Sequence, residues 1–205
     1  MHLVSAIDRT RYSIFEWRYN LSIPMKLVMA IAMAGMTGLL AQVRIFVEWS
    51  PVPITGQTLA VLLAGVLLGR RWGGASMAIY AVLGIAGVPW FNGMTSGLGA
   101  TGGYLIGFVL AALFIGYVTD KYIKSRYFLS MLGVMLFASL ILIYVPGILW
   151  LSIWLKAVSG VSVSIIPLIT MGVIPFIIGD IFKCVTAALI TRAVTPKNDY
   201  TGNKS

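Results

Sequence analysis

Residues 165–184 read IIPLITMGVIPFIIGDIFKC, an apolar stretch long enough to cross a membrane as a helix. Its only charged residues are Asp180 and Lys183, three positions apart. On a helix this spacing places the carboxylate and the ammonium group on one face, about one turn apart. A charged residue inside a membrane segment costs roughly 2.5–3.5 kcal/mol, so it normally faces a bundle interior or a watery cavity and has a partner. Asp180 and Lys183 are therefore the first candidate site.

The composition of the whole chain favours a membrane protein. Of its 205 residues, 59% are hydrophobic and only 10% are charged, whereas a soluble domain carries about 25% charged residues. The mean hydropathy is +0.94. Since each helical crossing takes roughly 20 residues, there is room for one bundle of about six spans. We therefore predict an all-α, integral membrane bundle of six transmembrane helices.

Charged residues and glycine-rich breaks divide the chain into these spans. The expected spans lie at 26–44, 49–69, 72–119 (two spans, separated by Pro89 and the glycines of 93–103), 127 to about 151, and 165 to about 194, where Pro167 and Pro175 start or kink the helix. The predicted parts are a basic, aromatic N-terminal segment at 1–24, the membrane domain at 25–195 and a tail at 196–205. The N-terminal segment is either a surface-bound amphipathic helix or a partly disordered tail.

The basic residues predict the orientation of the bundle, because Lys and Arg are retained in short cytoplasmic loops. With an even number of spans, both termini share a side, and most basic residues fall there. The opposite side has only Arg44 and Lys156. We expect both termini to be cytoplasmic and the chain to be a multi-pass protein of a prokaryotic plasma membrane. The net charge of +9 is then a topology signal rather than a nucleic-acid-binding patch.

Several kinds of chemistry are disfavoured by what the sequence lacks. His2 is the only histidine and Cys184 the only cysteine, so neither a metal centre nor a disulfide framework is predicted, and no cofactor is expected. No GxxxxGK[ST] motif is present, so ATP-driven transport would need the nucleotide on another polypeptide. An intramembrane enzyme that uses Asp180 and Lys183 as acid and base is a weak alternative, because it needs a further nucleophile or base.

Two more motifs fall on the side opposite the basic loops. SPVPITGQT at 50–58 has two prolines and neutral hydrogen-bonding groups that include Gln57. VPWFNGMTSGLGATGGYLIG at 88–107 combines glycines that permit close backbone approach with flat aromatic faces and one amide, that of Asn92. Together with the charged pair, these motifs predict an uncharged, partly aromatic ligand pocket with a few convergent polar groups.

Four of these motifs carry a resemblance to a known family. PVPITGQTLAVLLAGVLLG, YAVLGIAGVPWFNG, GATGGYLIGF and PFIIGDIFKCVTAAL occur in this order. The chain resembles the BioY family, the biotin-binding S-components of energy-coupling-factor (ECF) vitamin transporters, from about residue 24 to 194. It departs from the family at Ala100, where a proline is frequent, and in PFIIGD, where PFLPGD is common. Both departures concern backbone stiffness rather than polar groups.

The resemblance implies a six-helix component that captures biotin and passes it to separate coupling and ATPase subunits. A solitary biotin facilitator of the same fold is the alternative. The family's ligand-site residues correspond to Asn92, Gly103, Tyr104, Asp180 and Lys183. The two N–H donors and one carbonyl of the biotin ureido ring match an amide and a carboxylate. The remaining candidates are Trp90, Phe91 and Tyr104 for the fused rings, and Arg44 or Gln57 for the valerate carboxylate.

Small residues recur every fourth position on the first span, at Ala30, Ala34 and Gly38, and form a smooth stripe where a helix can approach closely. The resemblance implies that this stripe docks on the coupling subunit. Packing within the bundle is the alternative. We predict that Ala34→Trp leaves biotin binding intact and prevents assembly with the coupling subunit.

Each ligand-site assignment also has a purely structural explanation. Asp180 and Lys183 could form only a bundle-stabilising ion pair, and Asn92 could cap a turn. Tyr104 and Trp90 are also typical of the aromatic belts at membrane interfaces. Gly103 is equally consistent with close helix packing. The placement of these side chains in three dimensions decides among these explanations.

Overall fold

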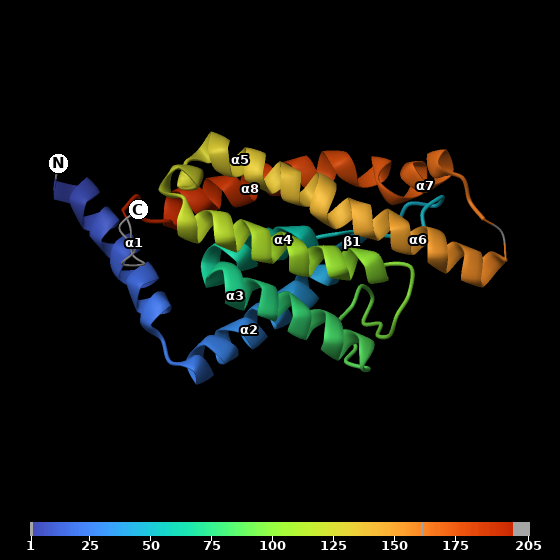
Figure 1. Cartoon of the computed structure of the whole chain (residues 1–205), viewed down its shortest axis with the longest axis horizontal. Coiled ribbons are helices and arrows are strands. Elements are labelled where there is room, and N and C mark those ends of the chain that lie inside the picture. Colours follow the sequence, from blue (N-terminus) through green and yellow to red (C-terminus); the bar gives the residue numbers. More distant parts are fainter. Residues whose placement is uncertain (1, 161, 199–205) are drawn as a thin grey trace.

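The computed structural model describes residues 2–160 and 162–198, and this part of the chain is mostly helical (Figure 1). The elements are α1 (His2–Asn20), α2 (Ile23–Ala41), α3 (Gln57–Ile85), α4 (Gly102–Lys121), the 3-10 helix η1 (Ile123–Arg126), α5 (Phe128–Phe137), the π-helix η2 (Ala138–Ile143), α6 (Tyr144–Ser159), α7 (Ile165–Gly172) and α8 (Ile174–Val194). Two short strands, β1 (Arg44–Ile45) and β2 (Ile54–Thr55), pair antiparallel before α3. The side chain of His2 and residues 199–205 of the predicted tail lie outside the description.

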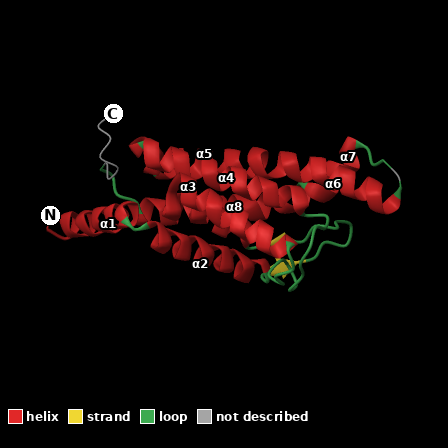
Figure 2. Cartoon of the chain, turned by 60° about the horizontal axis from the view of Figure 1, so that its bottom comes forward, coloured by secondary structure: helices red, strands yellow, loops and turns green. Residues whose placement is uncertain are grey.

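Four helices in the described part are long and apolar enough to cross a membrane. They are α2, α4, α8 and the continuous rod formed by α5, η2 and α6. The rod lies beside α4 and α8, and all three follow the long axis of the molecule (Figures 1 and 2). The chain is thus an all-helical, multi-pass membrane protein.

Helix α3 reverses direction and contributes two antiparallel arms. A straight helix rises about 1.5 Å per residue, so Gln57 and Tyr80 would lie about 35 Å apart. Instead, Gln57 Nε2 donates a hydrogen bond to the Tyr80 hydroxyl at 2.5 Å. The reversal occurs at Gly69, whose φ of +77° suits glycine. Gly73 packs directly against the backbone of Ala64, so the two arms touch because neither carries a bulky side chain there.

The helices differ in places from the predicted spans. The second span was predicted from Trp49, but a loop and β2 come first and the helix begins at Gln57. The fifth predicted span corresponds to the α5–η2–α6 rod, which continues to Ser159, beyond the predicted end at about 151. The sixth is divided into α7 and α8, and Pro175 takes the second position of α8, where its missing N–H costs no helical hydrogen bond. The N-terminal segment forms one helix, α1.

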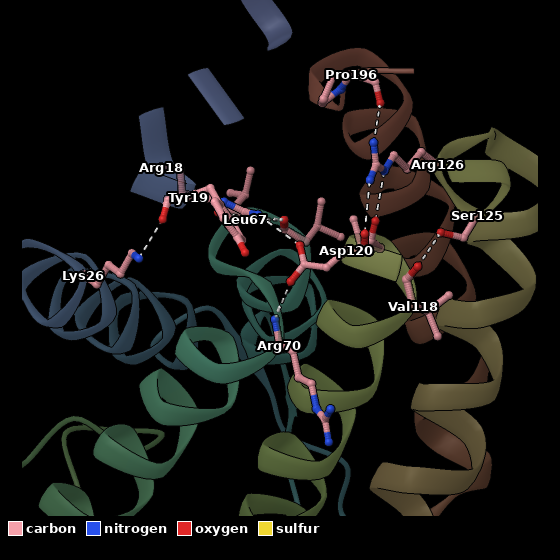
Figure 3. A network of polar contacts seen from close by, with 12 residues as sticks. Arg18, Tyr19, Lys26, Leu67, Arg70, Val118, Asp120, Ser125, Arg126 and Pro196 are labelled. Carbon is pink, nitrogen blue, oxygen red and sulfur yellow. Dashed lines mark hydrogen bonds and ion pairs between the residues drawn. The ribbon is translucent and has the colours of Figure 1, made fainter. Parts of the chain in front are cut away.

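Arg18 joins three elements at the end of the bundle that carries α1 (Figure 3). Its guanidinium, in a residue only 7% exposed, donates to the carbonyls of Val66 and Leu67. It also pairs with the Asp120 carboxylate at 3.0 Å. Asp120 in turn accepts the backbone N–H of Arg70, directly after the reversal of α3. The end of α1, the turn of α3 and the end of α4 are therefore held together.

Arg126 connects the end of α8 to the same region (Figure 3). The side chain is fully buried and donates to the carbonyls of Thr119, Pro196 and Asn198 at 2.9, 3.1 and 2.8 Å. Lys197 Nζ donates to the carbonyl of Arg126. Burial, and then the nearby guanidinium groups, lower the pKa of Lys197 to about 8. We call the end of the bundle that Arg18, Asp120 and Arg126 hold together the basic end.

Candidate functional site

A cavity lies in the other half of the bundle, where α4 and α8 begin. It encloses about 570 Å³, counting the open space at its mouth. The walls come from the loop before α3, the start of α3, the loop before α4, and helices α4, η2, α6 and α8. Segments far apart in the sequence therefore meet around it.

The lining combines apolar walls with polar groups. The apolar side chains are Val52, Pro53, Phe91, Leu105, Phe108, Ile143 and Phe176. The polar side chains are Thr55, Gln57, Thr58, Asn92, Thr101, Tyr104, Tyr144, Asp180 and Lys183. An apolar pocket with a few convergent polar groups can hold a small, mostly apolar ligand and fix its orientation.

Asp180 is the buried anion of this cavity, with only 3% of the residue exposed. Its Oδ1 accepts a hydrogen bond from Lys183 Nζ at 2.7 Å. Its Oδ2 accepts from the Tyr144 hydroxyl at 2.6 Å and, more weakly, from the Ser139 hydroxyl at 3.4 Å. A carboxylate has about four lone-pair sites, so three donors leave room for about one more. Asp180 can therefore accept a donor from a ligand without losing its present partners.

The loop 86–101 places Asn92 at the cavity. Gln42 of the chain after α2 holds this loop, because its Nε2 donates to the carbonyl of Phe91 and its Oε1 accepts the N–H of Met94. Among the described residues, none hydrogen-bonds to the side-chain amide of Asn92. Both the donor and the acceptor of this amide are thus available to a ligand.

Six of the nine residues that the sequence predicts for the ligand site line this cavity: Gln57, Phe91, Asn92, Tyr104, Asp180 and Lys183. Besides Asp180 and Lys183, two of them have hydrogen-bond partners within the chain. The Tyr104 hydroxyl donates to the carbonyl of Gly172 at 2.7 Å, and the Gln57 amide bonds to Thr55 and Tyr80. Tyr104 therefore offers a ligand its ring rather than its hydroxyl proton.

The other three predicted residues lie away from the cavity lining. The indole N–H of Trp90 donates to the carbonyl of Tyr80 at 3.0 Å, so Trp90 packs against α3. A Cβ atom at Gly103 would lie 2.1 Å from the carbonyl oxygen of Pro146, so this glycine permits close packing of α4 on α6. Arg44 is exposed and stacks over an aromatic ring. Packing or surface position accounts for each of them.

The small-residue stripe of α2 faces the bundle. Ala30 and Ala34 are fully buried, and a Cβ atom at Gly38 would meet Trp90 at 3.0 Å. Internal packing, the alternative explanation of the stripe, accounts for these positions, while docking on a partner stays a prediction. Because Ala34 has no free space around it, a tryptophan there disturbs the bundle as well as any docking surface.

Ser139 and Tyr144 hydrogen-bond to Asp180, and the sequence motifs do not single them out. Both are buried polar side chains in a mostly apolar rod and could be suspected on that ground. Their separation of five residues, however, places them about 140° apart on an α-helix. In the described residues, no group of three His, Cys, Asp or Glu side chains comes together as a metal site would require.

Apolar helices around a cavity with convergent polar groups define an integral membrane protein with a small-molecule site. Comparison with known proteins identifies the family to which this membrane protein belongs. The family model described as "BioY family" matches residues 15–199, so the chain belongs to the BioY family.

Relatives in this family share much of the chain. The "Probable biotin transporter BioY" of Methanothermobacter thermautotrophicus is 50% identical over 142 residues, which are 67% of this chain and 90% of that protein. The "Biotin transporter BioY" of Thermotoga maritima is 35% identical over 150 residues, which are 71% of this chain and 82% of that protein. The chain is thus similar, over most of their length, to proteins named as biotin transporters or probable biotin transporters.

A solved structure shares the fold. The crystal structure of the S-component for biotin from an ECF-type ABC transporter superposes with a TM-score of 0.71 at 25% sequence identity. The similarity covers 84% of this chain and 93% of that one. The helical arrangement described above is therefore that of an S-component.

Proposed function

We propose that this chain is the biotin-capturing S-component of an ECF-type transporter and that biotin binds in the cavity beside Asp180. The observation that carries the proposal is the cavity itself. In a chain of the BioY family, it brings a buried carboxylate with spare acceptor capacity next to a free amide and apolar walls. These groups come from segments that the sequence places almost 90 residues apart.

The ureido ring of biotin matches the polar groups of the cavity. The ring offers two N–H donors and one carbonyl acceptor. Asp180 has room for about one of these donors, and the amide oxygen of Asn92 can accept the other while its NH₂ group donates to the carbonyl. The site is thus suited to a ligand that presents donors and an acceptor side by side.

The apolar walls suit the rest of the ligand. The rings of Phe91 and Tyr104, with Phe108 and Phe176, can cover the fused ring system. Among the predicted contacts for the valerate carboxylate, Gln57 lines the cavity, whereas Arg44 lies at the surface. A polar ureido head and an apolar body therefore both find matching surroundings.

The topology supports six crossings with both termini in the cytoplasm. Four rods are long and apolar enough to span, and the two arms of α3 supply the other two. Arg18 and Arg126 place the end of α1 and the end of α8 in one region, as an even number of crossings requires. On this proposal the membrane domain is 25–195, between cytoplasmic segments at 1–24 and 196–205, in a prokaryotic plasma membrane.

Biotin uptake on this scheme needs other polypeptides for energy. The sequence has no GxxxxGK[ST] motif, so the ATPase subunits and the coupling subunit would be separate chains. The S-component fold shared with the solved structure supports such a partner. The curated relatives are transporters by name, which disfavours the alternative of an enzyme that uses Asp180 and Lys183.

A titration of the purified, detergent-solubilised chain with biotin tests the proposal. Trp90 packs on Tyr80 at 5.3 Å between ring centres, and Tyr80 in turn packs on the cavity-lining Phe91, so the fluorescence of Trp90 should respond to binding. Lipoate is the matched competitor, because it shares a valerate chain and a sulfur-containing ring with biotin but lacks the ureido group.

Saturable binding of biotin, with no displacement by lipoate, is the expected result. Displacement by lipoate at similar concentrations would show that the ureido contacts do not select the ligand. Absence of biotin binding by a well-folded preparation would overturn the assignment of the ligand and leave the membrane fold unaffected.

A further inference from the structure

The rod that faces α8 contains a π-helical turn at the depth of Asp180. Residues Ala138–Ile143 form this turn, between α5 and α6. A π-turn is closed by hydrogen bonds between residues five positions apart, is rare, and is frequent at functional sites. The turn lies beside the cavity, since Ile143 and the following Tyr144 both line it.

The π-turn aligns two hydroxyl groups that an α-helix would separate. Ser139 and Tyr144 are five residues apart, so on an α-helix they would point about 140° away from each other. Here both hydroxyls reach the same carboxylate oxygen, Oδ2 of Asp180, at 3.4 and 2.6 Å. Both residues are buried. The extra residue of the turn therefore brings them to one face.

Asp180 is consequently fixed from two helices. Lys183, on the same helix, holds Oδ1 at 2.7 Å, and the α5–α6 rod holds Oδ2. With one oxygen held from each side, the carboxylate has little freedom to rotate. A carboxylate whose orientation is set before the ligand arrives loses less conformational freedom on binding.

We infer that Ser139 and Tyr144 are positioning residues for biotin recognition, aligned by the π-turn to aim the Asp180 carboxylate into the cavity. This inference rests on the proposed function. Ser139 does not line the cavity and acts only through Asp180. Tyr144 lines it, but its proton is already donated to Asp180. The short Tyr144 contact is the stronger of the two and should carry the larger effect.

The experiment measures biotin affinity and the melting temperature for Tyr144→Phe, Ser139→Ala and Ser139→Thr. Exposed residues on or next to the same rod supply matched controls, Tyr127→Phe and Ser130→Ala. Tyr144→Phe should weaken biotin binding about tenfold, an effect of the size expected for the loss of one hydrogen bond to a charged group. Ser139→Ala should weaken it by a smaller factor, and Ser139→Thr, which keeps the hydroxyl, should restore it.

A double-mutant cycle separates positioning from a general structural role. If Tyr144 acts through the carboxylate, Tyr144→Phe should cause no further loss of affinity in an Asp180→Ala background. An equal loss of affinity from Tyr144→Phe in both backgrounds would overturn the inference while biotin binding by the wild type stands. Wild-type affinity for both Tyr144→Phe and Ser139→Ala would overturn it as well. No binding by the wild type would instead overturn the proposed function, and the inference with it.

Discussion

The two halves of the bundle bury polar groups in different ways. At the basic end, the buried guanidinium groups of Arg18 and Arg126 donate to backbone carbonyls and to Asp120, all within the chain. At the cavity, Asp180 is just as buried but keeps capacity for one more donor, and the Asn92 amide has no partner in the described residues. Of these charged and amide groups, those with unused hydrogen-bonding capacity lie at the cavity, although the buried Thr119 hydroxyl at the basic end also has no partner among the described residues.

This difference separates stability from recognition. A buried polar group whose hydrogen-bond partners all lie in the chain contributes to the stability of the fold. Removal of one partner leaves the remaining groups buried without a hydrogen bond, at the full cost of their desolvation. A group with spare capacity gains its last partner only when a ligand binds. Substitutions at the basic end should therefore lower stability and spare affinity, whereas those at the cavity should lower affinity more than stability.

The largest effect should come from Arg126→Ala. It leaves the buried carbonyls of Thr119 and Pro196 without their donor, and also removes the donor of the exposed Asn198 carbonyl, which should cost roughly 3–5 kcal/mol. The melting temperature in detergent should fall by about 10 °C, with biotin affinity of the folded fraction unchanged. The exposed Arg192→Ala is the control. A melting temperature equal to that of the control would contradict the structural role of the basic end.

Asp180→Asn should come next and act mainly on affinity. The change removes the anion that pairs with Lys183 and weakens the acceptor offered to the ligand. Biotin binding should weaken about 100-fold, or about 2.7 kcal/mol. Asp8→Asn, which breaks the partly exposed pair with Arg11, should leave binding unchanged. Equal affinities for wild type and Asp180→Asn would show that the buried pair only stabilises the bundle.

Gly69→Ala tests the reversal of α3. The φ of +77° disfavours any residue with a Cβ atom, and that atom would lie 2.5 Å from Asp120 Oδ2. The protein should lose about 2 kcal/mol of stability, or roughly 5 °C in melting temperature, and keep its affinity. Gly133→Ala in α5, where nothing lies within 4 Å of the new atom, should be neutral. Identical melting curves for the two variants would argue against the tight turn.

The smallest of these effects should be that of Asn92→Ala. Because no described residue hydrogen-bonds to this amide, its removal should leave the melting temperature unchanged. Biotin affinity should fall about tenfold, or about 1.4 kcal/mol. Asn20→Ala, at the exposed end of α1, serves as the control. A loss of stability without a loss of affinity would assign Asn92 to the loop rather than to the ligand.

The sequence predicted the class of fold and the chemistry of the cavity better than the limits of the elements. The apolar runs predicted the rods α2, α4 and α8, because a membrane span is defined by length and hydropathy alone. The expectation that a proline starts or kinks the last span is met at Pro175, in the first turn of α8, but the extension of α6 to Ser159 was not predicted. Helix ends depend on local capping and packing, which charge spacing does not report.

The candidate site shows the same difference between features that depend on the local sequence and features that depend on packing. The pairing of Asp180 with Lys183 was predicted because it depends only on their spacing within one helix. The positions of Trp90 and Gly103 behind the cavity were not, since an aromatic ring or a glycine looks the same in a sequence whether it faces a ligand or a neighbouring helix.

By itself, then, the sequence determined that the chain is a helical membrane bundle with a buried anion and cation on one helix, because hydropathy and helical periodicity act along the chain. Only the tertiary structure decided which side chains surround the cavity and how Asp180 is held. Ser139 and Tyr144 reach its carboxylate through a π-turn in another rod, and such a contact depends on register and packing between helices rather than on spacing within one.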